Sequence, residues 1–202
     1  MYPANISEPL TEDMFFSGKL EETNEGYAIA KLAIARLCEY VSRENSSFNY
    51  KTIIPCNLYG RFDKFKVDYS HLVAAVIHKV HQAKKMNVNE VEIWGDGMAR
   101  REFMYAGDLA EAIIWSINHF DELPKYMNIG LGIDMTINEY YMEVAKVIGF
   151  TGNFTHDKTK PVGMIRKLVN TDLQTKLGWQ PNTRLEVGLK KTYEFYLKEI
   201  AE

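Results

Sequence analysis

The longest run of apolar residues at helical spacing follows Thr23 and Asn24, either of which can cap the amino end of a helix. Its apolar members are Ile29, Leu32, Ala33, Leu37, Tyr40 and Val41. In the first turns of this predicted helix, Tyr27 and Lys31 are four positions apart. Side chains at this spacing lie one above the other, so a hydroxyl and an ammonium group can project into one site.

The rest of the chain predicts alternating strands and helices. Residues 51–55 form an apolar run that ends at a proline, and residues 91–94 alternate as a strand does before a glycine-rich turn. Helices are expected from His71 onward, over residues 109–120, over 137–148 between Thr136 and Gly149, and over 185–200. A further short strand is expected at 127–129. This order predicts a mixed α/β fold in which residues 51–55 form an inner strand of a parallel sheet.

Tyr27 and Lys31 are candidates for acid–base chemistry. Tyrosine, with an ordinary pKa of about 10, is a poor acid or base at neutral pH, but a neighbouring ammonium group favours the phenolate. Tyr27 could then pass a proton to a carbonyl oxygen while a hydride reaches the carbonyl carbon. The pattern alone is weak, because a packed tyrosine beside a solvated lysine is common on helices.

Composition narrows the class of protein. The chain has 202 residues, 46% of them hydrophobic, which is enough for a substantial core. A net charge of -3 argues against general nucleic-acid binding. No apolar run approaches the roughly 20 residues of a membrane span, and the amino terminus lacks a signal-peptide pattern, so we expect a cytoplasmic protein. The two cysteines, Cys38 and Cys56, are too few for a disulfide framework or a four-cysteine zinc site, so we expect both to be reduced and no metal to be bound.

Three ordered segments make the Tyr27 pattern more specific. They are Thr23–Lys31, the run Thr-Ile-Ile-Pro-Cys-Asn-Leu-Tyr-Gly at 52–60, and residues 100–113, which begin Arg-Arg-Glu-Phe. Together they resemble the extended short-chain dehydrogenase/reductase family, and within it the GDP-L-fucose synthases. The likeness covers nearly the whole chain and continues through Tyr69-Ser70-His71, Trp94-Gly95-Asp96-Gly97, Lys160-Pro161-Val162-Gly163, Arg166-Lys167-Leu168 and Leu177-Gly178-Trp179.

The resemblance implies NADPH-dependent 3,5-epimerisation and 4-reduction of a GDP-4-keto-6-deoxy sugar, with GDP-L-fucose as product. It also implies the carboxy-terminal part of a Rossmann-type parallel sheet, interleaved with a small α/β substrate-binding domain. Residues 1–60 would belong to the sheet, and 61–202 mainly to the substrate domain, with 103–130 returning to the sheet. No G-x-G-x-x-G motif opens a helix, so we expect this chain to be the later portion of a longer reductase and inactive alone.

The resemblance also assigns catalytic and cofactor-binding roles. Tyr27 would protonate the O4 oxygen, and Lys31 would lower the tyrosine pKa and hold the nicotinamide ribose. His71 would act as the acid in epimerisation and lie near the cofactor, although a lone histidine at a helix start is more often a surface group. The nicotinamide and the sugar would contact the backbone of Pro55, Cys56, Asn57 and Leu58. Cys56 could replace the epimerisation base only if its thiol faced the pocket.

Substrate contacts are implied for Asn57, Lys79, Trp94 and Arg101. Lys79 stands where the family usually has arginine, so it keeps the charge but loses the bidentate fork. Trp94 could stack on guanine or fill the core. Arg101 would hold the diphosphate bidentately. His78 and His81 fit no motif and are expected on the surface, and residues 61–69 are expected to form a lid-like loop.

Several alternatives stay open. The basic cluster of Lys158, Lys160, Arg166 and Lys167 is either a phosphate site or a solvated face. Val162 replaces an aspartate usual in the family, which leaves the sugar in doubt. The chain could instead serve a GDP-heptose 4-reductase, or be a non-catalytic remnant that binds sugar nucleotides or dimerises. A homodimer is expected through one face of the Tyr27 helix, formed by Ala30, Ile34, Leu37, Cys38 and Val41.

Overall fold

Helix α1 (Glu25–Glu44) is the long helix predicted after Asn24. The computed structural model describes residues 1–4, 6–65, 70–160 and 163–201. The Asn24 side chain makes no capping bond to α1; instead, the Glu21 carboxylate accepts from the Thr23 backbone N–H at 3.1 Å in the preceding turn, η2 (Glu22–Asn24). The side-chain cap therefore lies one turn earlier than predicted, because the Glu21 carboxylate satisfies a backbone N–H group at the start of η2.

Much of the apolar surface of α1 is exposed. Ala28 and Ala35 are buried, whereas Leu37 is 61% exposed. On its buried side α1 packs against a cluster formed by the amino-terminal segment and Ile54, and the Glu39 carboxylate accepts a 2.8 Å hydrogen bond from the Tyr126 hydroxyl. The helix thus has one packed face and one apolar face without a partner in the described part of the chain.

Short parallel pairs make up most of the strands. β1 (Thr52–Pro55) pairs with β6 (Tyr126–Ile129), and β2 (Asn57–Tyr59) pairs with β5 (Phe103–Tyr105). Within the described residues β1 has only one hydrogen-bonded neighbour, so the inner strand predicted at 51–55 is an edge strand here. The chain leaves one pair and enters the other at Cys56, whose backbone N–H still bonds the Ile129 carbonyl at 2.9 Å.

The remaining strands form two further sheets. β3 (Glu90–Trp94) pairs in parallel with β8 (Asn153–Asp157). β4 (Arg100–Arg101) lies between β7 (Met135–Thr136), to which it is antiparallel, and β9 (Arg166–Lys167), to which it is parallel. The sequence pattern predicted β3 but not β4, β7, β8 or β9.

Helix α4 (Ile137–Ile148) confirms its predicted limits. The Thr136 hydroxyl accepts from the Glu139 backbone N–H at 3.1 Å, and the Glu139 carboxylate accepts from the Thr136 backbone N–H at 2.6 Å. Gly149 ends the helix at a φ of 72°, in the left-handed region that glycine tolerates. This capping box explains why local sequence signals were sufficient here.

The other helices follow the prediction less closely. α2 (Leu72–Lys85) begins after His71, and α6 (Leu185–Glu199) ends one residue early. α3 (Ala106–Asn118) is displaced toward the amino terminus, and α5 (Asp172–Lys176) was not predicted. Two single 3-10 turns complete the described elements, η1 (Glu12–Met14) and η4 (Phe120–Glu122). None of the helices in the described part of the chain is long and apolar enough to cross a membrane.

His78 and His81 are not the surface residues that the sequence suggested. Their Nδ1 atoms each lie 3.0 Å from a hydroxyl on α6, that of Tyr196 for His78 and that of Tyr193 for His81. Burial lowers the pKa of both histidines. Both are therefore only partly exposed, because a helix from more than 110 positions away covers them, which periodicity within α2 cannot show.

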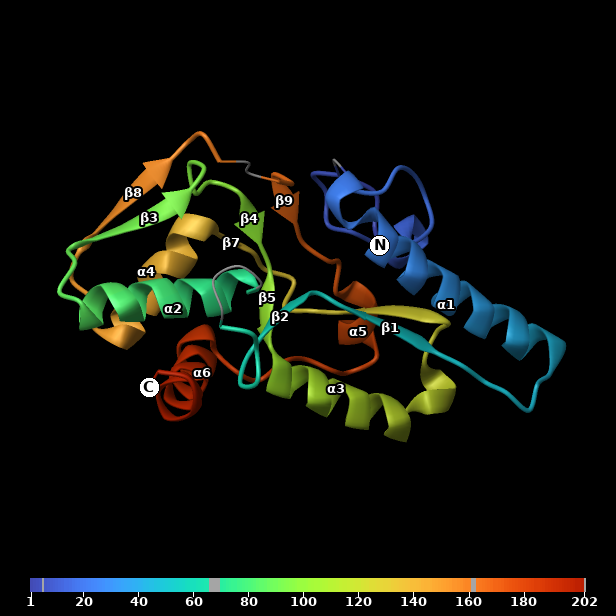
Figure 1. Cartoon of the computed structure of the whole chain (residues 1–202). Coiled ribbons are helices and arrows are strands. Elements are labelled where there is room, and N and C mark those ends of the chain that lie inside the picture. Colours follow the sequence, from blue (N-terminus) through green and yellow to red (C-terminus); the bar gives the residue numbers. More distant parts are fainter. Residues whose placement is uncertain (5, 66–69, 161–162, 202) are drawn as a thin grey trace.

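The helices and strands pack around separate hydrophobic cores. Figure 1 shows α1 at one end and α2, α4 and α6 toward the other, with β2 and β5 between them in this view. One core joins α2, α4, α6 and β3, and another joins α3, α5, β5 and β6. The proposed division at residue 60, with 103–130 returning to the sheet, stays a prediction.

Candidate functional site

Strands β4 and β9 arrange four basic residues on two faces. In their parallel register, Arg100 lies beside Arg166 and Arg101 lies beside Lys167. Successive side chains of a strand point to opposite faces. One face therefore carries Arg100 and Arg166, and the other carries Arg101 and Lys167.

On the first face, Arg100 and Arg166 share one carboxylate, that of Asp134. Its buried carboxylate accepts from Arg100 Nε at 2.8 Å and from Arg166 Nε at 2.5 Å. Burial alone would raise the pKa of Asp134, but the hydrogen bonds and charges of the two guanidinium groups outweigh it, so its pKa lies below the ordinary value. Asp134 thus stays ionised, and Arg100 and Arg166 are structural.

The second face has no such counter-charge. Among the described residues, no carboxylate lies within salt-bridge distance of Arg101 or Lys167. Arg101 donates to the Arg100 carbonyl at 2.8 Å, and Lys167 Nζ donates to Asn57 Oδ1 at 3.1 Å. Burial lowers the pKa of Lys167, and the charge of Arg101 lowers it further. Two half-buried cations side by side are unfavourable alone, so this face is suited to binding an anion.

Asn57 connects this face to the sheet. It begins β2, and its Nδ2 donates to the Glu102 carbonyl at 2.8 Å while its Oδ1 accepts from Lys167. Asn57 follows the carboxyl end of β1, the edge at which open α/β sheets bind ligands. Lys167 therefore lies between two predicted site residues, since it bonds to Asn57 and is the strand neighbour of Arg101. The sequence identified Lys167 only as one member of a basic cluster.

The residues next to Asn57 have no reactive side chain available to a ligand. Pro55 ends β1, and Leu58 packs against the core that contains Met104. The Cys56 thiol is buried, and burial raises its pKa well above the ordinary value. A buried, neutral thiol cannot act as the replacement epimerisation base.

Tyr27 and Lys31 lie together on α1, as their spacing predicts. Lys31 Nζ is 5.6 Å from the centroid of the Tyr27 ring, and the Tyr27 side chain is 62% exposed. The hydroxyl is thus accessible to a ligand. Within the described residues, neither side chain bonds to His71 or Asn57, so the catalytic roles of the pair stay predictions.

His71 occupies the amino cap of α2 but does not cap it with its side chain. Its Nδ1 lies 3.1 Å from Asp63 Oδ1, and the imidazole is largely exposed. The contact with a carboxylate holds the ring toward the loop that precedes α2. Tyr69, at the start of the same motif, and residues 66–68 of the predicted lid lie outside the described residues.

Trp94 is a surface aromatic with ammonium groups near its ring. It is 54% exposed, which excludes the alternative that it fills the core. Lys79 Nζ lies 5.1 Å from the ring centroid, and Lys160 Nζ lies 5.6 Å from it. Cations near an aromatic face favour an electron-rich, anionic ligand beside the ring. Val162, the residue that departs from the family pattern, lies outside the described residues.

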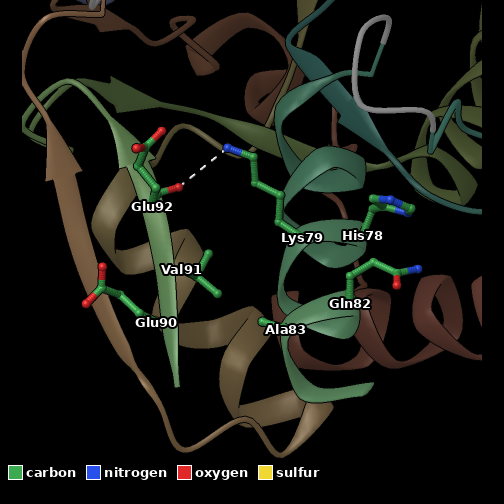
Figure 2. A pocket seen from close by; sticks show the side chains of 7 residues that line it. All are labelled: His78, Lys79, Gln82, Ala83, Glu90, Val91 and Glu92. Carbon is green, nitrogen blue, oxygen red and sulfur yellow. Dashed lines mark hydrogen bonds between the residues drawn. The ribbon is translucent and has the colours of Figure 1, made fainter. Parts of the chain in front are cut away.

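Figure 2 shows the groove beside Lys79, between α2 and β3. It has a volume of about 400 Å³ and is lined by His78, Lys79, Gln82, Ala83, Glu90, Val91 and Glu92. Lys79 extends from α2 toward β3 and donates to the Glu92 carbonyl at 3.4 Å. Burial lowers the pKa of Lys79, and the charge of Glu92 opposes this. The groove itself carries two exposed glutamates, so an anionic ligand is favoured at the Trp94 end.

The fold and these basic residues can be compared with known proteins. The chain belongs to the NAD dependent epimerase/dehydratase family, whose sequence pattern matches residues 1–130. It is 54% identical over 199 residues to a GDP-L-colitose synthase of Yersinia pseudotuberculosis, a match that covers 98% of this chain and 65% of that protein. It is 47% identical over 197 residues to a GDP-L-fucose synthase of Azorhizobium caulinodans, with 98% and 63% covered.

The solved structures agree with the fold. A GDP-mannoheptose C4 reductase from Campylobacter jejuni, determined with NADP bound, superposes with a TM-score of 0.84 at 30% identity. The match covers 97% of this chain and 67% of the reductase. The prediction of a mixed α/β, Rossmann-type fold is confirmed. The chain spans slightly less than two thirds of the length of the two curated relatives.

Proposed function

We propose that this chain forms the substrate-binding and proton-transfer part of an enzyme that epimerises a GDP-4-keto-6-deoxy sugar and reduces it at C4 with NADPH, giving GDP-L-fucose. The observation that carries the proposal is the β4–β9 face, on which Arg101 and Lys167 lie side by side without a carboxylate partner among the described residues. A diphosphate supplies the missing negative charge. Unpaired cysteines are consistent with a cytoplasmic location for this reaction.

In this proposal the nucleotide end of the substrate is held at two places. The Arg101 guanidinium offers a planar fork that matches phosphate oxygens, and Lys167 adds a point charge oriented by Asn57. Trp94 offers its exposed ring to the guanine, and Lys79 and Lys160 near that ring favour the adjacent phosphates. The relatives named for GDP sugars support the choice of nucleotide.

The residues of this chain fit one end of the dinucleotide. In this proposal Lys31 holds the nicotinamide ribose, and the backbone of residues 55–58, at the carboxyl end of β1, contacts the nicotinamide. The pyrophosphate requires backbone N–H groups at a glycine-rich helix start, and no such motif occurs in the 202 residues. When bound, NADPH supplies the hydride for C4.

Proton transfer in this proposal comes from two side chains. The accessible Tyr27 hydroxyl donates its proton to the O4 oxygen, and the Lys31 ammonium stabilises the phenolate that remains. His71, exposed beside Asp63, exchanges the proton needed for epimerisation. Since the Cys56 thiol is buried and neutral, the matching base does not come from Cys56.

We expect the 202-residue chain to bind GDP but to bind NADPH too weakly for calorimetric detection. GDP meets the Arg101–Lys167 face, whereas the dinucleotide lacks its pyrophosphate site. Titration of one protein sample with each ligand tests this. Tight NADPH binding would overturn the proposed cofactor site, and absence of GDP binding would overturn the proposed function.

The identity of the sugar has three candidates. The 54% identity to a GDP-L-colitose synthase makes GDP-L-colitose a second candidate product, beside GDP-L-fucose. The likeness to a GDP-mannoheptose C4 reductase keeps a heptose reductase as the third. With the chain joined to the part of the GDP-L-colitose synthase that its match leaves uncovered, mass spectrometry of the product formed from each corresponding ketosugar discriminates the three.

We also propose a homodimer through α1. Its unpacked face exposes Ile34 and Leu37, 58% and 61% respectively, and continues over Ala30, Cys38 and Val41. A two-fold axis through such a face buries the same residues on both copies. We expect the wild-type chain to be dimeric in light scattering at high concentration and Leu37→Glu to be monomeric. A monomeric wild type, or a dimer that Leu37→Glu leaves intact, would count against this interface.

A further inference from the structure

The carboxylate of Glu102 is a buried charge that the proposed chemistry does not use. Its side chain is fully buried, between Arg101 of β4 and Phe103 of β5. Oε1 accepts from the backbone N–H groups of Leu131 at 2.6 Å and Gly132 at 2.9 Å, and Oε2 accepts from that of Val169 at 2.9 Å. Burial raises the pKa of Glu102, and these three backbone hydrogen bonds oppose that rise. Since both oxygens only accept, the hydrogen bonds suit the ionised carboxylate.

These bonds connect the segments that carry the anion-binding face. Val169 follows Lys167 by two residues, and Glu102 follows Arg101 directly, so one carboxylate ties the ends of β4 and β9 together. The carboxylate also lies so close to Gly130 that an added Cβ there would be 2.4 Å from Oε1. This close approach leaves little room for the ends of β4, β9 and β6, which Gly130 follows, to shift.

Charged and titratable groups surround Glu102 on every packed element. Arg101 on β4, Lys167 on β9 and Cys56 before β2 lie near it, as do Asp134 before β7 and Tyr140 on α4. The Tyr140 hydroxyl donates to the Arg101 carbonyl at 3.0 Å. Of these groups, Arg101 and Lys167 are the cations without a carboxylate in salt-bridge contact among the described residues. Glu102 is therefore the negative charge built into the rear of their face.

We propose that Glu102 is a positioning residue for the diphosphate site: its buried carboxylate fixes the spacing of Arg101 and Lys167 and keeps the Lys167 ammonium charged. This inference rests on the proposed function, since it deepens the account of the same site. Glu102 does not touch the ligand. It acts through the three backbone N–H groups and through its charge.

The test is the pH dependence of GDP affinity in Glu102→Gln. Affinity falls as pH rises through the pKa of Lys167, because the neutral amine no longer attracts phosphate. Burial lowers that pKa, and the Glu102 charge raises it. Removing the charge should move the loss of affinity to lower pH, so as pH rises the variant should weaken earlier than wild type. At a pH between the Lys167 pKa of the variant and that of wild type we expect about a tenfold larger Kd for the variant, the effect of losing roughly one charge-assisted hydrogen bond. At a pH high enough to neutralise Lys167 in both proteins, the difference should disappear.

Two variants separate positioning from simple stabilisation. Gln174, on α5, is also buried and bonds Gly130 through N–H and C=O at 2.9 and 2.8 Å, so Gln174→Met removes a neutral brace of the same loop. We expect it to lower Tm but leave the GDP Kd of the folded protein and its pH profile unchanged. Glu102→Asp keeps the charge and should keep the wild-type pH profile despite a lower Tm.

The outcomes are distinguishable. If wild type does not bind GDP, the proposed function fails, and this inference fails with it. If wild type binds GDP but Glu102→Gln and Gln174→Met share the wild-type pH profile, the proposed function stands and Glu102 is merely structural. A shifted profile in Glu102→Gln alone supports the positioning role.

Discussion

Tyr27→Phe should lower the rate of C4 reduction by about a thousandfold while GDP affinity stays unchanged. The substitution removes one oxygen, and that oxygen acts in the transition state, when the developing O4 charge takes its proton. Because the Tyr27 hydroxyl is exposed on α1 and no side-chain hydrogen bond to it is present among the described residues, its loss leaves the fold intact.

The measurement needs a form of the protein that also binds the dinucleotide. This chain can be joined to the part of the Y. pseudotuberculosis relative that its match leaves uncovered, and NADPH consumption can be followed by absorbance. Tyr40→Phe is the matched control, since Tyr40 lies on the same helix and is 51% exposed. Unchanged turnover in Tyr27→Phe would remove Tyr27 from the mechanism, and an equal loss in Tyr40→Phe would indicate an effect on the helix.

The double variant Arg101→Met with Lys167→Met should weaken GDP binding by at least about a hundredfold. Each cation offers a charge-assisted hydrogen bond to phosphate, and hydrogen bonds to charged groups contribute about 1.5–3 kcal/mol. Neither cation has a salt-bridge partner among the described residues, and the buried Glu102 carboxylate behind them keeps its hydrogen bonds to the backbone N–H groups of Leu131, Gly132 and Val169. Folding should therefore persist, which circular dichroism can verify.

Lys176→Met is the control for the change in charge. Lys176 is exposed at the end of α5, and its substitution removes one ammonium group, as Lys167→Met does. We expect the GDP Kd of this variant to equal that of wild type, and guanosine to bind wild type and the double variant equally. A double variant that retains wild-type GDP affinity would contradict the anion site.

The part of the fold that the sequence could predict depends on residues close together in the chain. α4 was predicted to the residue because Thr136, Glu139 and Gly149 form its caps from within five positions of its ends. Tyr27 and Lys31 were placed together because four-residue spacing fixes neighbours on any helix. These features depend on the chain within one or two turns.

That Arg101 and Lys167 lie side by side could not be predicted, because it depends on pairing between distant segments. β4 and β9 have two residues each, too short for any periodic pattern, and they are separated by more than 60 positions. Only their register shows that Lys167 lies beside Arg101 while Arg166 shares Asp134 with Arg100. The same limit explains His78 and His81, whose covering helix α6 lies at the other end of the sequence.

The most direct measurement is a crystal structure of the 202-residue chain with GDP. The central claim is that Arg101 and Lys167 form the diphosphate site. We predict phosphate oxygens within hydrogen-bond distance of the Arg101 guanidinium and of Lys167 Nζ, with the guanine against Trp94. GDP bound only in the groove of His78, Gln82 and Glu90 between α2 and β3, with the Arg101–Lys167 face free of phosphate, would contradict it.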